Sequence, residues 1–174
     1  MMIKASLLGA TALLTIAAAQ AAADSGPTDP QIAHIAYTAG VIDIAAAKQA
    51  LAKSHNASVR SFAETMVRDH QAVNDQALAL VGKLHVTPAD NATSAALSAQ
   101  AAATHRRLDA LKGAAFDRAY VANEAAYHGT VNEALQGTLI PSADNGELKS
   151  LLETGLTLFR EHQMHADQLA KKFK

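Results

Sequence analysis

Apolar residues recur every three to four positions along most of the chain, and this spacing predicts long amphipathic helices. Capping residues, prolines and glycines interrupt the pattern and mark the helix ends. The first helix is predicted from Thr28-Asp29-Pro30 to about Lys53, because Thr28 is a capping residue and proline is tolerated in a first turn. The further segments are a second helix between the break at Ser54-His55-Asn56 and Thr87-Pro88, an alanine-rich helix over about 93–112, a helix over about 114–136, a loop over 137–146 around Pro141, and a last helix over about 147–172.

These segments predict an all-α fold. Four long helices with short breaks, and one longer connection in the middle, favour a four-helix bundle with an additional helical linker between the second and third long helices. Aromatic residues make up only 4% of the chain, and its 9 glycines and 4 prolines are too few for the turns of an all-β protein. Residues 24–174 have the usual size of one domain.

The N-terminal residues have the pattern of a secretory signal peptide. Lys4 precedes an apolar run over 5–18, and the small residues around Ala21 and Ala23 fit the specificity of signal peptidase. The signal peptide is therefore predicted over residues 1–23, and the mature protein is expected to be periplasmic or secreted. No later stretch reaches the roughly 18 apolar residues of a membrane span, so we expect no transmembrane segment in the mature chain.

Cleavage after Ala21 or Ala23 is the testable consequence of this assignment. Mass spectrometry of the exported protein should find one of these two new N-termini, because signal peptidase cuts after a small residue that follows the apolar run. Exported material that still contains Lys4 would contradict the prediction.

Charge and cysteine content exclude several classes of function. Lys and Arg total 15 against 16 Asp and Glu, so the chain has no basic excess that would attract nucleic acid. The absence of cysteine excludes disulfides, thiolate chemistry, iron–sulfur clusters and a lipoprotein acylation site. Metal ligands, if there are any, must come from His, carboxylate or Met side chains.

Every long helix places an ionisable residue on its apolar face when residues are set at about 100° intervals around the helix axis. The inward residues are Asp43 in the first helix, His70 in the second, Glu124 and His128 in the third, and His162 in the fourth. Counted from the predicted helix starts, Asp43 and the three histidines lie about 14 to 17 residues along. The sequence therefore predicts one polar layer at mid-height of the bundle.

Two interpretations of this layer remain open. Neutral imidazoles and carboxylates that point into a helical bundle are typical ligands of Cu, Zn, Fe or Mn, and a shared ion offsets the cost of burying them. Alternatively, Asp43 and His70 form a buried ion pair and Glu124 satisfies His128 or His162, which gives a polar core without a metal.

The other polar candidates are weaker. Asp117 and Tyr120 share one face of the third long helix, where they are predicted to form a bridging hydrogen bond. Four other histidines are predicted on outer faces or near helix ends, and they are His34, His55, His85 and His105. No Ser/His/Asp set, P-loop or dinucleotide fingerprint occurs in a supporting context.

Three blocks of the sequence resemble the bacterial family of domains of unknown function numbered 4142. They are Ser58–His70, with its Met-Val-Arg-Asp-His end, Phe116-Asp117-Arg118-Ala119-Tyr120 with His128 after it, and Glu161-His162 with Ala166. The resemblance implies an exported, ferritin-like four-helix bundle. It selects Asp43, His70, Asp117, Tyr120, His128 and His162 as site residues. It does not imply ferroxidase activity, because the paired Glu-x-x-His of di-iron ferritins is missing.

We therefore expect an exported helical-bundle protein that binds a transition metal and acts in metal handling or envelope stress rather than as an enzyme. The expected ligands are His70, His128, His162, Asp43 and Glu124, with Asp117 and Tyr120 as supporting residues. The alternative is a structural or interaction protein of the cell envelope with a metal-free polar core. A third reading is an enzyme that handles peroxide or oxygen. An envelope protein partner or a homo-oligomer is compatible with each of these functions.

Overall fold

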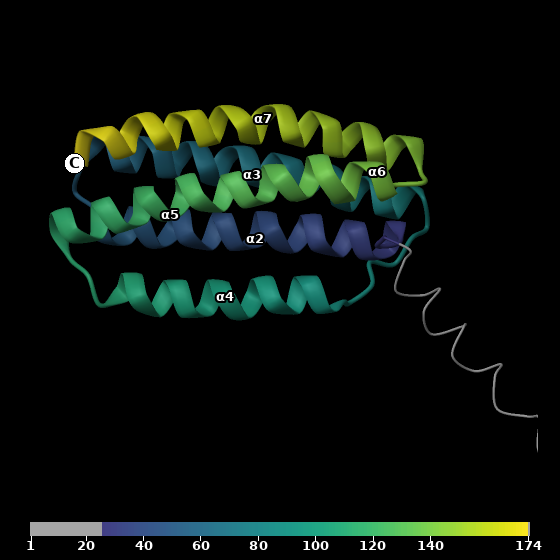
Figure 1. The fold of residues 1–174 in the computed structure, drawn as a ribbon, viewed down its shortest axis with the longest axis horizontal. Helices are drawn as coiled ribbons and strands as arrows, with labels where there is room; N and C mark the ends of the chain where they lie inside the picture. The colour runs from purple at the N-terminus through teal and green to yellow at the C-terminus, as the bar shows by residue number, and fades with distance from the viewer. Residues whose placement is uncertain (1–25, 174) are drawn as a thin grey trace, which may run out of the picture.

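The computed structural model describes residues 26–173, and within this range all the regular secondary structure is helical (Figure 1). The predicted all-α bundle is confirmed, and the predicted signal peptide over 1–23 lies outside the described residues. The long helices are α2 (Asp29–Lys53), α3 (Ala57–Lys83), α4 (Ala92–Asp109), α5 (Gly113–Ala134) and α7 (Gly146–Ala170). Short pieces complete the order: a π-helical turn (Leu135–Leu139), α6 (Ile140–Ser142) and a final 3₁₀ turn (Lys171–Phe173).

The bundle consists of two antiparallel helix pairs. Helix α2 packs along α3, helix α5 packs along α7, and α4 runs along the outside of α2 (Figure 1). Helix α4 carries the chain from the end of α3 back to the other end of the bundle, so α5 starts beside the beginning of α3. One long crossover between two helix pairs is the topology of ferritin-like folds, and here the crossover is itself a helix.

Side chains cap the helix starts where the sequence predicts them. The Asn56 carboxamide oxygen accepts hydrogen bonds from the Ser58 and Val59 N–H groups at 2.9 and 3.2 Å. At the start of α2 the Gln31 side chain accepts from the Thr28 N–H at 3.0 Å. Each such bond satisfies an N–H group that has no partner inside the helix. Local chemistry therefore sets where α2 and α3 begin.

The loop predicted over 137–146 is wrong for most of its length. The helical path of α5 continues through the π-helical turn and α6 as far as Ser142. In the π-helical turn the Ile140 N–H bonds the Leu135 carbonyl, five residues back. Pro141 then falls in the first turn of α6, where its missing N–H costs little. The proline changes the hydrogen-bond pattern here without ending the helix.

Helix α4 is held to α2 at both of its ends. Near its start, His34 of α2 contacts the Ser94 hydroxyl at 2.9 Å and an Asp90 carboxylate oxygen at 3.1 Å. At its end, the Gln49 and Lys53 side chains donate to Asp109. His34 is therefore half-buried and bonded, which corrects its predicted place on an outer, solvated face.

A layer of buried polar residues divides the core into two hydrophobic clusters. One cluster lies toward the C-terminal end of α2 and contains Phe62, Met66, Phe116, Tyr120 and Leu169 among others. The other lies toward the N-terminal end of α2 and contains Ile32, Leu135, Leu139, Leu152 and Phe159 among others. None of the helices between residues 26 and 173 has the length and apolar character needed to cross a membrane.

Candidate metal centre

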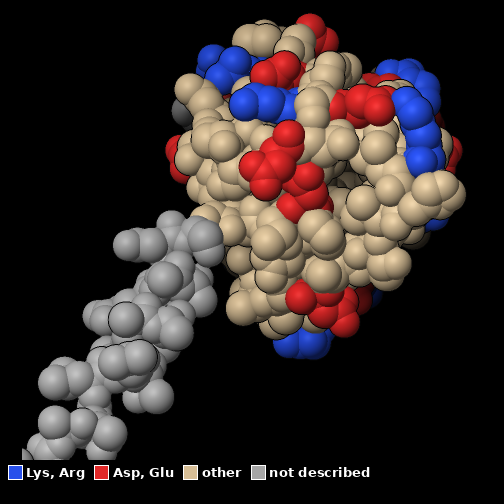
Figure 2. All heavy atoms as spheres, turned by 90° about the vertical axis from the view of Figure 1, so that its right-hand side faces the viewer, with Lys and Arg blue, Asp and Glu red and all other residues tan. Residues whose placement is uncertain are grey.

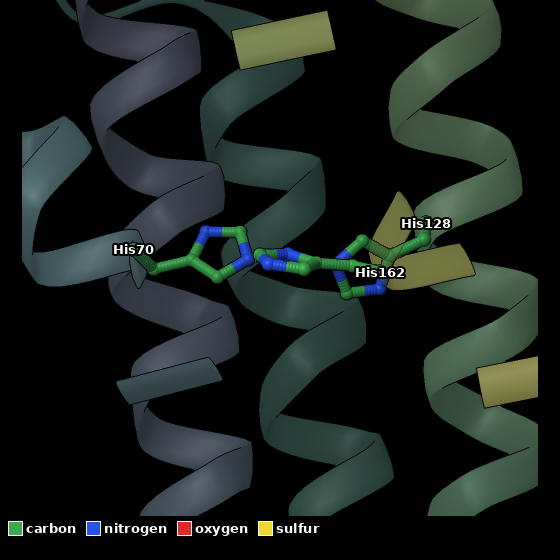
Figure 3. Close-up of side chains that lie close together, drawn as sticks. All are labelled: His70, His128 and His162. Carbon is green, nitrogen blue, oxygen red and sulfur yellow. The ribbon is translucent and has the colours of Figure 1, made fainter. Parts of the chain in front are cut away.

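Three histidines from three helices meet in the polar layer. His70 of α3, His128 of α5 and His162 of α7 point toward one another (Figure 3). The Nε2 atoms of His70 and His128 lie 3.4 Å apart, and a nitrogen of each ring lies within 4.8 Å of one nitrogen on each of the others. All three side chains are buried. Three imidazoles this close together form a group that could hold a metal ion.

Two buried carboxyl groups adjoin the histidines. The Asp43 Oδ2 atom of α2 lies 3.5 Å from the Nε2 atoms of both His70 and His128. The Glu124 Oε2 atom lies 3.9 Å from Nδ1 of His128, and the exposed fraction is 1% for each of Asp43, Glu124 and His128. Asp43, Glu124 and His128 form a second group that could hold a metal ion. The structure thus brings all five residues predicted as ligands into one layer.

Hydrogen bonds orient two of the imidazoles. The Nδ1–H of His128 donates to the Glu124 backbone carbonyl at 3.0 Å, which leaves the lone pair on Nε2. The Nε2–H of His162 donates to the Asp69 carboxylate at 3.0 Å, which leaves the lone pair on Nδ1. Each ring therefore has one nitrogen held by the protein and the other free to bind a metal.

Burial keeps the imidazoles neutral. It lowers the pKa of His128 from 6.5 to about 4, although the bond to the Glu124 carbonyl acts in the opposite direction. Burial also lowers the pKa of His70 well below its usual value, and the neighbouring His128 and His162 add to this effect. The pKa of His162 is lowered by burial as well, with Asp69 opposing it. A neutral imidazole is the form that binds metals, so these rings have no proton to release at neutral pH.

Burial has the opposite effect on the carboxyl groups. It raises the pKa of Asp43 from 3.8 to about 7. The pKa of Glu124 is raised well above its usual value, first by burial and then by the adjacent Asp43. Burial therefore favours the uncharged form of both Asp43 and His70 where they touch. The metal-free alternative is matched in its contact, at 3.5 Å between Asp43 Oδ2 and His70 Nε2, while burial opposes the charges of an ion pair there.

Several polar atoms of the layer have no hydrogen-bond partner among the described residues. They are both carboxyl oxygens of Asp43, Oε2 of Glu124, Nδ1 of His70 and Nδ1 of His162. Nearly all buried polar atoms in proteins are paired, and an unpaired one costs about 1 to 3 kcal/mol. A cation at this position would engage such atoms together, so the residues present fit a bound metal.

Comparison with known protein families identifies the chain. Its sequence matches the family described as a domain of unknown function, DUF4142, over residues 14–169. The chain belongs to the DUF4142 family. No curated protein and no solved structure matches it. The family assignment made from the three sequence blocks is thereby confirmed.

One residue of the DUF4142 block at the end of Ser58–His70 has a role that the sequence analysis missed. Asp69 lies beside His70 in the chain, yet its carboxylate bonds His162 on the neighbouring helix α7. Arg68 holds the same carboxylate through two N–H groups, at 2.8 and 3.1 Å. Partial burial raises the pKa of Asp69, but the bonds from Arg68 and His162 outweigh it and lower the pKa overall. The only signal in the sequence was the Asp-His pair of the DUF4142 block.

Asp69 is therefore expected to support metal binding without touching the metal. Replacing Asp69 with Ala should weaken metal affinity about 10- to 100-fold, because His162 loses the acceptor that fixes its tautomer and orientation. Competition with a chromogenic chelator would measure the change. Asp75→Ala is the matched control, since Asp75 is an exposed aspartate on the same helix. Equal affinities of the two variants would refute this role.

A second DUF4142 block, Phe116 to Tyr120, does not form the predicted bridging hydrogen bond. Oδ1 of Asp117 and the hydroxyl of Tyr120 are both buried, and neither has a partner within residues 26–173. Tyr120 lies in a hydrophobic cluster, stacked on Phe116 with 6.1 Å between ring centroids. Burial raises the pKa of its hydroxyl, and the nearby Glu124 and Asp43 raise it further. The Tyr120 ring thus packs among aromatic side chains rather than bonding Asp117.

A small cleft leads from the surface to the carboxyl side of the layer. It has a volume of about 130 Å³ and lies between α2, α4 and α5. Asp43 and Glu124 line it, together with Thr104 and His105 of α4. His105 is thus half-buried in the cleft wall, whereas the sequence analysis placed it on a solvated face. The cleft therefore ends at two residues that are each 1% exposed.

Proposed function

We propose that this DUF4142 protein binds a transition-metal ion through His70, His128 and His162, with Asp43 as a carboxylate ligand, and that it works in metal handling. Glu124 is the second carboxyl group beside the ion. One observation carries the proposal: three neutral imidazoles and two carboxyl groups share one buried layer, in which several polar atoms have no hydrogen-bond partner among residues 26–173.

A metal-free polar core explains this layer less well. Such a core is stabilising when its members satisfy one another, and a half-satisfied network costs more than an apolar core. Here both Asp43 oxygens lack a hydrogen bond within the described part of the chain, and the Nε2 atoms of His70 and His128 face each other. Ligation by a cation would satisfy the carboxylate and the ring nitrogens at once.

The donor set narrows the class of metal. Imidazole and carboxylate ligands together suit Zn, Cu, Fe and Mn, and the layer offers no thiolate that would select a softer ion. When bound, the ion would supply Lewis-acid or redox chemistry according to its identity. The protein's own residues keep the imidazoles neutral, hold the His128 and His162 rings in place and surround the site with apolar side chains.

The predicted signal peptide supports a function outside the cytoplasm. A periplasmic or secreted protein meets metal ions that are not buffered by cytoplasmic thiols. Binding a first-row metal in a buried layer would there serve metal handling or protection against envelope stress. The support for this step is the N-terminal pattern around Lys4 and Ala21.

The test is the metal content of untagged protein purified from its own compartment, followed by titration with Zn, Cu, Fe and Mn. A polyhistidine tag must be avoided because it binds the same ions. We expect one of these metals at close to one ion per chain, together with a rise in thermal stability on reloading. Protein that contains no metal and gains no stability from any of the four would overturn the proposal in favour of a structural polar core.

A further inference from the structure

A large apolar cavity lies in one half of the bundle. The Phe159 ring separates it from His70. The volume of the cavity is about 590 Å³, and side chains from α2, α3, α4, α5 and α7 line it. Among the lining residues are Ala36, Val73, Leu80, Val131, Leu152 and Phe159. The cavity reaches the end of the bundle where α2 and α7 begin, which faces the viewer in Figure 2. Binding pockets for small organic molecules have volumes of this order.

Small residues produce the cavity. Ala36, Ala39 and Gly40 on α2 face it, opposite Ala77 on α3 and Gly155 on α7. The other hydrophobic cluster is filled by Phe62, Phe116 and Tyr120, whereas Phe159 is the one buried aromatic residue of this cluster. Protein interiors are normally packed as densely as organic crystals. A space of this size inside a bundle is therefore one that a ligand could fill.

The lining chemistry defines the ligand. None of the described residues around the cavity is Asp, Glu, Lys, Arg or His, so a charged molecule would lose its hydration without compensation. Asn74 is 4% exposed and borders the cavity. The amide lies over Gly40, where an added Cβ would come within 2.3 Å of the Asn74 Oδ1 atom. An amide offers both a donor and an acceptor to one polar group of a ligand.

We propose that this cavity binds an uncharged, mainly hydrocarbon molecule that carries one hydrogen-bonding group, which the Asn74 amide recognises. The cavity is separate from the metal centre: the Phe159 ring lies between them, stacked on His70 with 4.6 Å between ring centroids. This proposal does not rest on metal binding, and the metal-free protein should bind the same molecule.

The test is a fluorescence titration of the purified exported protein with N-phenyl-1-naphthylamine, an uncharged aromatic amine that emits strongly in apolar surroundings. We expect saturable binding at one site per chain. 1-Decanol should displace the probe, and decanoate at pH 8 should do so at least about tenfold less well because its carboxylate is charged. Absence of saturable binding, or equal displacement by decanol and decanoate, would overturn the proposal.

Two substitutions locate the site. Ala77→Phe should fill the cavity and weaken probe binding at least about tenfold, whereas the matched control Ala79→Phe, exposed on the same helix, should leave it within about twofold. Asn74→Leu should weaken displacement by decanol about tenfold, the value of one lost hydrogen bond. Circular dichroism checks that each variant folds. If Ala77→Phe does not fold, the comparison of decanol with decanoate on the unaltered protein still tests the proposal. Equal loss in Ala77→Phe and Ala79→Phe would indicate adsorption to the surface and contradict the proposal.

Discussion

Replacing His70, His128 or His162 singly with Ala should lower metal affinity by at least about 100-fold. Residues that only orient a ligand cost about 10- to 100-fold when they are changed, and loss of a direct ligand from a small site costs more. Isothermal titration or chelator competition with the preferred metal measures the effect. His55→Ala is the control, because His55 is exposed at the break between α2 and α3. His34 would be a poor control, since it helps to hold α4 against α2.

The three variants should also act as one unit. Once one ligand is gone, removing a second should add little further loss, because the residues share one ion and their effects are not independent. A purely structural polar layer would give a different result. If the protein binds no metal and His70→Ala costs only the roughly 1 to 3 kcal/mol of a broken buried polar contact, the layer is structural.

Asp43 should make the metal-free protein less stable as the pH rises from about 4 to about 7. The pKa of Asp43 is about 7 in the folded protein, whereas its ordinary value, which applies to the unfolded chain, is 3.8. In this window the unfolded chain has released the proton that the folded protein still holds, so each rise in pH favours unfolding. The stabilising contribution of protonated Asp43 to the free energy of unfolding is complete below about pH 4 and lost above about pH 7. A shift of this size corresponds to several kcal/mol.

The histidines act in the opposite direction, so the Asp43 effect must be isolated. The pKa of His70 and that of His128 are lowered by burial, and their contribution to stability rises as the pH increases toward 6.5. Asp43→Asn keeps a neutral group at the position and leaves the histidines in place. We expect the unfolding free energy of the unaltered protein, minus that of Asp43→Asn, to fall between pH 4 and 7 and to level off above. Urea unfolding at several pH values, with all metal removed, measures it.

The affinity for a metal should change with pH in the opposite direction to the stability of the metal-free protein. An ion bound by Asp43 competes with the proton, so affinity should rise with pH until Asp43 is ionised, near pH 7, and Asp43→Asn should lose that rise. A pH-independent difference between the two metal-free proteins would show that Asp43 ionises in the folded protein as it does in water, and would contradict its placement as a buried acid.

Local sequence patterns were sufficient for the main architecture. Helical spacing and the caps at Thr28 and Asn56 predicted the bounds of α2 and the start of α3, because these depend on residues within one or two turns. The same spacing put Asp43 and His70 on inward faces, and similar counts from the helix starts put them at one height. The failure around Pro141 is local too, since a proline that follows a π-helical turn cannot be distinguished by composition from one that begins a loop.

Only the tertiary structure decided how these helices meet. That Asp69 bonds His162 depends on how α3 packs against α7, and no pattern within one helix reports such a contact. Burial between α2, α3, α5 and α7 favours uncharged side chains in the polar layer and leaves several of its donors and acceptors without a partner among residues 26–173. The apolar cavity likewise results from small residues on α2, α3 and α7 that face one another. The sequence alone determined which residues point inward, and packing between the helices determined which groups those residues contact.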